Sequence, residues 1–289
     1  MIGNIASYLA VFMWGATFGL VLLCGNIPTL LLVGVACLIL GILSGIEELI
    51  SGRGGIRSLQ APAGASLFEA FGWIGYRIMA WPAMLMVDPV EAANTVNVWI
   101  VGAIIFGLLR AGERLGVRHY LGLSCFAGGL LVMGLDGIGM GHVLAFAGGM
   151  IWAWYVVQAP YVEGSGRQAG AIGGVAGGAA LIVLSVITEK PWDIGAVDLF
   201  WLFWLVVVAN AGFVLWRYGA RHGEARKAKI GVLFAPVAAV LWIWVLGGAD
   251  LTASGIAGVA AITAAGLIAS PHVFKEGKKA RHGGQADSL

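Results

Sequence analysis

The chain contains few charged residues, and this shortage limits the kind of protein it can be. Only 11% of its 289 residues are charged, whereas 60% are hydrophobic and the mean hydropathy is +0.90. A water-soluble domain of this size could not bury so much apolar surface, so the composition predicts a protein that crosses the membrane many times. The net charge of +2 also argues against nucleic acid as a partner, because nucleic acid binding needs a continuous basic surface.

Cysteines and the usual catalytic motifs are also scarce. The three cysteines, Cys24, Cys37 and Cys125, lie inside apolar runs, which is typical of small buried side chains and not of disulfides or metal ligands. The sequence contains no phosphate-binding loop, no zinc-binding histidine pair at helical spacing and no pair of intramembrane aspartates. We therefore expect no cofactor, no metal and no enzymatic activity.

Long apolar runs dominate what remains. They divide into about ten spans, each close to the ~20 residues that a helix needs to cross a bilayer. A membrane β-barrel would instead show alternating segments of ~10 residues. The predicted fold is thus an all-α polytopic membrane protein, with spans near 4–24, 28–45, 67–87, 90–110, 119–136, 141–161, 168–188, 197–217, 229–247 and 253–271.

Lysine and arginine are distributed unevenly between these spans. All but two of them lie in segments that follow an even-numbered span; the exceptions are Lys190, on the other side, and Arg77, inside the third span. Cytoplasmic loops retain positive charge, so both chain termini are predicted to be cytoplasmic. The polar tail, 275–289, is predicted to be a disordered cytoplasmic segment.

The two halves of the chain resemble each other at equivalent spans. Gly112-Glu113-Arg114-Leu115 near the end of the fourth span precedes Gly122, and Gly248-Ala249-Asp250-Leu251 near the end of the ninth precedes Gly258, with the same spacing from leucine to glycine. An odd number of spans in each half would insert the second half upside down, as in many secondary transporters. We predict ten transmembrane helices in two inverted five-helix repeats, residues 1–138 and 139–274.

Arg77 is the most informative single residue. It lies about ten residues into its span, or ~15 Å along the helix, where an arginine costs at least ~2.5 kcal/mol and marks a functional site by default. Either it faces a water-filled cavity and attracts an anionic group, or it packs against backbone carbonyls or extends to the headgroups. No carboxylate accompanies it at that depth, since Glu69 is placed nearer the cytoplasmic mouth. This favours a facilitator, or a coupling mechanism that uses no side-chain carboxylate.

Amide and aromatic side chains at mid-depth complete the candidate site. The amides either bond to other helices or contact a substrate, and the rings either pack against lipid or form a stacking wall for a planar substrate. The candidate substrate-binding residues are Trp14, Phe18, Tyr76, Arg77, Asn94, Asn97, Trp99, Trp152, Tyr155, Asn210 and Phe213.

Glycines recur every four residues at Gly170, Gly174 and Gly178. Such positions let two helices approach closely in lipid. Packing within one bundle is favoured over an oligomer interface, so the chain is expected to be a monomer or a weak homo-oligomer in the bilayer.

Several short motifs resemble the drug/metabolite transporter superfamily, of the EamA type. They are Phe12-Met13-Trp14-Gly15-Ala16, Gly112-Glu113-Arg114-Leu115, Trp216-Arg217-Tyr218-Gly219-Ala220 and Pro236. Gly75-Tyr76, the run from Asn94 to Trp99 and the tryptophans of the sixth span are similar to aromatic amino acid exporters of the YddG type. The resemblance implies ten helices in two inverted repeats, a central cavity, and export of amino acids across the bacterial inner membrane by alternating access.

Two departures from the pattern and three alternative functions accompany this resemblance. Ile100 stands where many members have proline, so a hinge in the fourth span need not be shared with the ninth, and Ala249-Asp250 stands where the second repeat often has glutamate. A broad drug or metabolite exporter is disfavoured by Arg77, which should repel cations. A membrane-embedded transferase would need an acidic metal-binding pair, and a channel would need a continuous polar lining.

Overall fold

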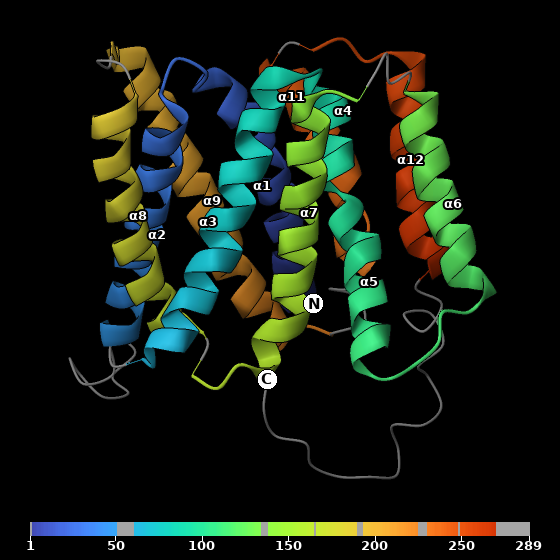
Figure 1. Cartoon of the computed structure of the whole chain (residues 1–289), viewed down its shortest axis with the longest axis horizontal. Coiled ribbons are helices and arrows are strands. Elements are labelled where there is room, and N and C mark those ends of the chain that lie inside the picture. The colour runs from blue at the N-terminus through green and yellow to red at the C-terminus, as the bar shows by residue number, and fades with distance from the viewer. Residues whose placement is uncertain are drawn as a thin grey trace.

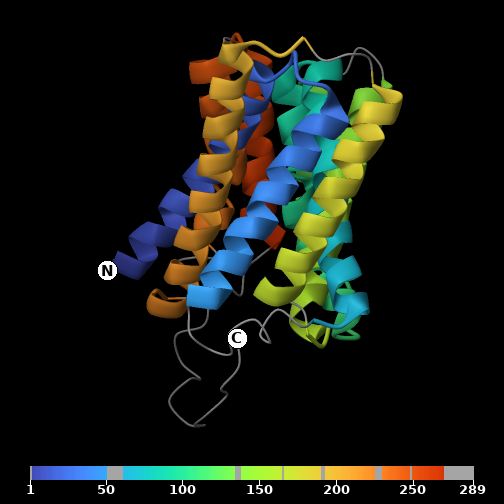
Figure 2. The same cartoon turned by 90° about the vertical axis from the view of Figure 1, so that its left-hand side faces the viewer.

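The computed structural model describes residues 2–50, 61–133, 138–164, 166–189, 193–224, 230–247 and 249–269. In these ranges all regular secondary structure is helical, which confirms the predicted all-α class (Figure 1). The helices run roughly parallel or antiparallel to one another in a single bundle (Figures 1 and 2). The predicted tail, 275–289, and Lys190 lie outside the described residues.

The helices follow the order of the predicted spans. Within the described ranges, six segments are long and apolar enough to cross a membrane by themselves: 2–23, 29–50, 89–110, 140–161, 167–188 and 196–220. The bounds are α1 (Ile2–Leu23), α2 (Thr29–Ile50), α3 (Ala63–Met86), α4 (Pro89–Val96), α5 (Val98–Arg110), α6 (Val117–Val132), α7 (Met140–Gln158), α8 (Arg167–Thr188), α9 (Ala196–His222), α11 (Ala235–Gly247) and α12 (Ala253–Ala269). Each predicted span thus overlaps one of these helices, except that the fourth corresponds to α4 and α5 together; the sixth also includes a short 3-10 helix, Ala159–Tyr161, and the ninth a helical turn at 230–232.

The fourth span is interrupted at Asn97, although it lacks the proline that would suggest a break. α4 ends at Val96 and α5 begins at Val98; the side-chain Nδ2 of Asn97 donates a hydrogen bond of 2.7 Å to the carbonyl oxygen of Ala93. A side-chain amide that binds a backbone carbonyl offers the chain an alternative to regular helix. The ninth predicted span is interrupted as well, by a turn at Leu233 and Phe234 that precedes α11.

α2 extends five residues beyond the predicted end of the second span, and its last turn carries Glu47 and Glu48. Polar residues at this point predict that the second span ends earlier, at residue 45. Arg167 Nη1 lies 3.2 Å from Glu47 Oε1, and Arg217 also pairs with Glu47. These ion pairs compensate the carboxylates, so the helix continues to Ile50.

Glycines bring α2 and α8 into close contact. A Cβ atom added at Gly41 in α2 would lie 2.6 Å from the backbone nitrogen of Val175, and one at Gly178 in α8 would lie 2.5 Å from that of Leu38. Only glycine permits this separation between the two backbones. The repeat of glycines at 174 and 178 therefore serves packing within the bundle, and α2 and α8 lie side by side in both views (Figures 1 and 2).

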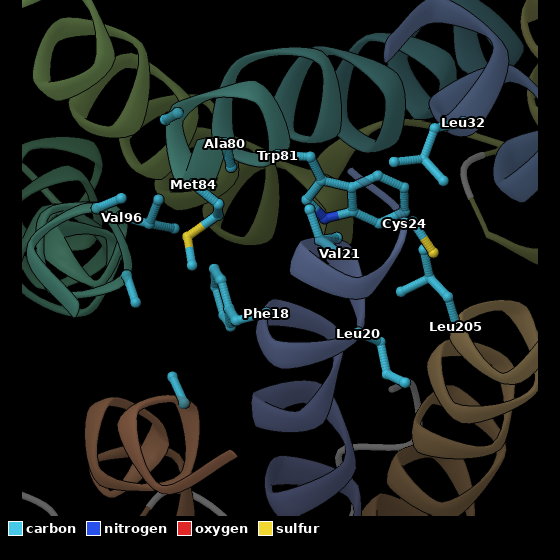
Figure 3. Close-up of a cluster of buried hydrophobic side chains, with 14 of the residues drawn as sticks. Phe18, Leu20, Val21, Cys24, Leu32, Ala80, Trp81, Met84, Val96 and Leu205 are labelled. Carbon is cyan, nitrogen blue, oxygen red and sulfur yellow. The ribbon is translucent and has the colours of Figure 1, made fainter. Parts of the chain in front are cut away.

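Buried apolar side chains fill the bundle near the end where α1 and α3 finish and α4 begins. Phe18 and Val21 of α1 meet Trp81 and Met84 of α3 there (Figure 3). Leu205 of α9 belongs to the same cluster and is fully buried. We call this end the closed face, and the opposite end, where Arg110, Arg167 and Arg217 lie, the basic face.

Candidate functional site

A cavity of about 850 Å³ occupies the middle of the bundle and reaches toward the basic face. Trp14, Arg77 and Trp152 line it at mid-height, whereas Arg167 and Arg217 line it near the helix ends. The buried cluster of Figure 3 lies on the other side, so the cavity does not reach the closed face. A smaller cavity of about 70 Å³ adjoins it and shares five lining residues with it: Trp14, Arg77, Trp99, Trp152 and Phe213.

Arg77 lies between the two cavities and is only 5% exposed. Its Nη1 lies 3.6 Å from the Sγ atom of Cys37, and its guanidinium carbon lies 5.3 Å from the ring centre of Trp73 and 5.5 Å from that of Trp81. Such contacts between a desolvated cation and aromatic rings contribute up to ~2 kcal/mol each. The helix tolerates this arginine because two indole rings of α3 itself flank it.

No carboxylate pairs with Arg77 among the residues that the structure describes, and none of its hydrogen bonds there goes to a backbone carbonyl. A guanidinium has five N–H donors, and a thiol is a weak acceptor. Arg77 therefore presents a positive charge with unused donors to the cavities. The structure thus places Arg77 on the walls of both cavities, and its role in binding a substrate stays a prediction.

Aromatic rings line the two cavities in two groups, which we call the two walls. On one wall Trp14 of α1 lies 5.2 Å from Phe213 of α9, and on the other Tyr76 of α3 lies 5.2 Å from Trp152 of α7, as measured between ring centres. Trp73 stacks on Phe213 at 4.4 Å and an interplanar angle of 29°, which joins the two walls. These separations are typical of favourable offset or tilted ring pairs.

Glu69 lines the same cavity near the first residues of α3, closer to the basic face than Arg77, and is 3% exposed. Its Oε2 accepts hydrogen bonds from the hydroxyl of Tyr155 at 2.6 Å and from Nε1 of Trp73 at 3.0 Å. Its Oε1 accepts one from the backbone nitrogen of Gly166 at 2.9 Å. Gly166 has a φ of +122° and precedes the first residue of α8, so this carboxylate also lies at a helix N-terminus, where negative charge is favourable.

The sequence alone does not single out Glu69 as a site residue. It lies near the start of α3, toward the basic face, but its burial and its place on the cavity wall follow from partners in α7 and at the start of α8. One signal in the sequence points the same way: Glu69, Trp73 and Arg77 are four residues apart and so share one face of α3.

Ion pairs surround the mouth of the cavity at the basic face. Arg167 Nε lies 3.5 Å from Glu48 Oε2, and Gln168 Nε2 donates to Glu48 Oε1 at 3.2 Å. Arg217 and Arg167 both pair with Glu47. These contacts connect α2 with α8 and α9, and they balance the charge of the two arginines at the mouth, in contrast to Arg77.

Nine of the eleven predicted site residues line one or both cavities. Asn94 and Asn210 do not: Asn94 is fully buried and its Nδ2 lies 3.1 Å from the sulfur atom of Met133, directly after α6, whereas Nδ2 of Asn210 donates to the carbonyl of Val206 in its own helix. Asn94 thus takes the interhelical role that was the alternative to substrate contact. The nine are Trp14, Phe18, Tyr76, Arg77, Asn97, Trp99, Trp152, Tyr155 and Phe213.

Comparison with known proteins supports the resemblance seen in the motifs. A model of the EamA-like transporter family matches residues 139–270. The aromatic amino acid exporter YddG of Ancylobacter novellus is 26% identical over 260 residues, which cover 84% of this chain and 88% of that protein. A solved structure entitled "Crystal structure of protein" has the same fold, with a TM-score of 0.70 and 21% identity over 94% of this chain and 97% of its own. The resemblance is confirmed, and it points to a membrane transporter and not to an enzyme.

Proposed function

We propose that this EamA-type membrane transporter exports amino acids, chiefly aromatic ones, across the bacterial inner membrane by alternating access. The observation that carries the proposal is Arg77, a buried cation without a carboxylate partner in the described residues, placed between two aromatic walls. The name of the relative from Ancylobacter novellus supports the same substrate class.

The cavity offers separate positions for the two ends of an aromatic amino acid. The guanidinium of Arg77 would bind the carboxylate, because its planar N–H groups can hold both carboxylate oxygens. The substrate ring would lie between the walls, against Trp14 and Phe213 on one side and Trp152 on the other. Contacts between aromatic rings contribute ~0.5–1.5 kcal/mol each beyond the burial of apolar area. Phe18, Tyr76, Asn97, Trp99 and Tyr155 would complete the pocket.

The packing of the helices supports two related halves, residues 1–138 and 139–274. α1, the first helix of one half, packs against α9 and α11, and α7, the first helix of the other, packs against α3 and the pair α4–α5. α2 packs against α8, and α6 packs against α12. A pseudo-two-fold axis would exchange these contacts in this manner, and a substrate site at the interface of inverted repeats is typical of secondary transporters.

The state seen here suits the loading step of an exporter. The cavity reaches the basic face and stops at the buried cluster of Figure 3. We assign the basic face and both chain termini to the cytoplasm, because cytoplasmic segments retain Lys and Arg. Substrate would therefore enter from the cytoplasm, and the closed face would have to separate before release.

Counterflow into proteoliposomes tests the function directly. Vesicles loaded with unlabelled tryptophan should accumulate labelled tryptophan and phenylalanine, and leucine less. Arg77→Ala should raise the half-saturating tryptophan concentration by about 10- to 100-fold, which corresponds to the ~1.5–3 kcal/mol of a hydrogen bond to a charged group. Arg114→Ala, at an exposed position of the basic face, is the matched control and should transport normally.

Two results would contradict the proposal. The substrate class would be excluded if none of the amino acids were taken up by a preparation whose protein shows a cooperative thermal unfolding transition and is therefore folded. Accumulation of an organic cation such as ethidium in place of tryptophan would favour a broad drug exporter, the alternative that the charge of Arg77 opposes.

A further inference from the structure

We propose that the cavity recognises the carboxylate and the ring of its substrate but not the α-amino group, so that its substrates are aromatic monocarboxylates in general. Compounds that lack the amino group, such as arylpropionates, would be bound as well as the amino acids. This inference deepens the proposed function and rests on it. Its basis is the position and the partners of the one acidic side chain on the cavity wall.

Glu69 is the only acidic residue among the described residues that line either cavity. It lies eight residues from Arg77 in α3, a separation of ~12 Å along the helix axis. The amino and carboxylate groups of an α-amino acid are attached to the same carbon atom. Trp73 lies between the two positions on the same helix face: its Nε1 bonds to Glu69, and its ring centre lies 5.3 Å from the guanidinium carbon. A substrate whose carboxylate is bound by Arg77 would have to reach past this indole ring to place its ammonium group on Glu69.

Both oxygens of Glu69 are also already engaged. The donors are Gly166 for Oε1, and Tyr155 and Trp73 for Oε2, at distances from 2.6 to 3.0 Å. An ammonium group that approached Glu69 would have to compete with these three donors for a carboxylate with about four acceptor positions, in a residue that is 3% exposed. The carboxylate thus holds the wall of the cavity together and offers a ligand little accessible surface.

The two glutamates near the mouth of the cavity also have ion-pair or hydrogen-bond partners. Glu47 pairs with Arg167 and Arg217, and Glu48 pairs with Arg167 and Gln168. Neither glutamate lines the cavity. Charge at the mouth is therefore balanced between side chains, and the uncompensated charge near the centre is the positive charge of Arg77.

An ammonium group near Arg77 would meet an environment that does not favour it. The faces of Trp73 and Trp81 already flank the guanidinium, and the rings of Trp14 and Trp152 are those against which the substrate ring would lie. Asn97 is the one side-chain amide among the described residues that line either cavity, and a neutral acceptor does not offset the removal of a full charge from water. The guanidinium itself repels a second cation. Removal of the amino group should therefore leave binding unchanged or improve it.

Three ligands with one ring system separate the contributions of the two groups. Tryptophan carries both groups, indole-3-propionate lacks the amino group, and tryptamine lacks the carboxylate. Isothermal titration calorimetry of the full chain in detergent should show indole-3-propionate binding at least as tightly as tryptophan. Tryptamine should bind at least about tenfold more weakly, because it has no partner for Arg77.

The ratio of the first two affinities decides the inference. Binding of tryptophan at least tenfold tighter than indole-3-propionate would overturn it while leaving amino acid export intact. Tryptophan counterflow that fails while indole-3-propionate binds would instead remove the proposed function. If none of the three ligands bound, both the further inference and the proposed function would be wrong.

Variants test whether Glu69 or Arg77 binds each group of the ligand. The two affinities are compared within one preparation of each variant, because partial unfolding would change both of them by the same factor. Glu69→Gln should leave the ratio of tryptophan to indole-3-propionate affinity unchanged, because Glu69 does not bind the amino group. Arg77→Gln should weaken the binding of both ligands and leave that of tryptamine unchanged or tighter, because the guanidinium no longer repels its ammonium group. A Glu69→Gln protein that loses tryptophan affinity selectively would show that Glu69 is the ammonium site and would overturn the inference.

Discussion

The hydroxyl group of Tyr155 in α7 donates a hydrogen bond of 2.6 Å to Oε2 of Glu69 in α3. The same oxygen accepts from Trp73, and the other carboxylate oxygen accepts from the backbone of Gly166. One buried carboxylate thus connects α3, α7 and the start of α8 at the basic end of the cavity. A carboxylate in this position is stable only while its donors remain in place.

Loss of the Tyr155 donor should destabilise the bundle. Tyr155→Phe keeps the ring against Trp152 but leaves Glu69 with one donor fewer, and an incompletely bonded buried group costs ~1–3 kcal/mol. The expected result is a lower midpoint of thermal unfolding, measured in detergent by tryptophan fluorescence. Tyr161→Phe is the matched control because Tyr161 is 65% exposed, and it should not shift the midpoint. Equal midpoints for both variants would show that the bond adds nothing to stability.

The contact between α2 and α8 should tolerate no additional methyl group. A Cβ atom at Gly41 would lie 2.6 Å from the nitrogen of Val175 and 2.8 Å from the carbonyl oxygen of Ala171, both of which are backbone atoms. Gly41→Ala must therefore separate the helices, at ~1–3 kcal/mol. Gly107→Ala has open space around the added atom and should be neutral or slightly stabilising, since alanine favours helix. Retention of the wild-type midpoint by Gly41→Ala would mean that the two helices can separate at little energetic cost.

The helices could be placed from the sequence because of a constraint that lipid imposes. Backbone groups within a bilayer must bond within their own segment, so an apolar run of sufficient length becomes a helix of nearly the same length. The first span, predicted at 4–24, is found as Ile2–Leu23, and the seventh, predicted at 168–188, is found as Arg167–Thr188. The end of α2 was less predictable, since its glutamates are compensated by arginines more than a hundred residues away.

The partners of a polar side chain could not be predicted in the same way. Hydropathy indicates the depth of a residue but not the direction in which its helix turns it. Asn94 and Asn97 are one turn apart, yet the chain breaks between α4 and α5, and only Asn97 lines a cavity. Glu69 illustrates the same limit, because Tyr155 lies 86 positions from it along the chain.

Stacking on Phe213 should matter more for aromatic than for aliphatic substrates. Its ring contacts Trp14 on its own wall and stacks on Trp73, so it lies where the two aromatic walls meet. Phe213→Leu keeps an apolar side chain but removes ring contacts worth ~0.5–1.5 kcal/mol, a factor of about 2 to 12 in affinity. The half-saturating concentration in counterflow should rise by that factor for tryptophan and remain nearly constant for leucine. Phe203→Leu in the same helix is the control, at a position that is 60% exposed on the outside of the bundle. An equal change for both amino acids would show that Phe213 only shapes the cavity.

Access to the cavity from one face predicts a pattern of chemical labelling. In a protein whose native cysteines are replaced by alanine, Ala103→Cys places a thiol on the cavity wall, and Met84→Cys places one in the buried cluster at the closed face. A membrane-impermeant methanethiosulfonate reagent should modify position 103 from the cytoplasmic side only, and tryptophan should slow the reaction. Position 84 should remain unmodified from either side while the closed face stays packed, since Met84 is 1% exposed. Mass spectrometry of vesicles of known orientation measures both reactions. Modification of position 103 from the periplasmic side would reverse the assigned orientation, and rapid modification of position 84 would show that the resting protein opens to the closed face.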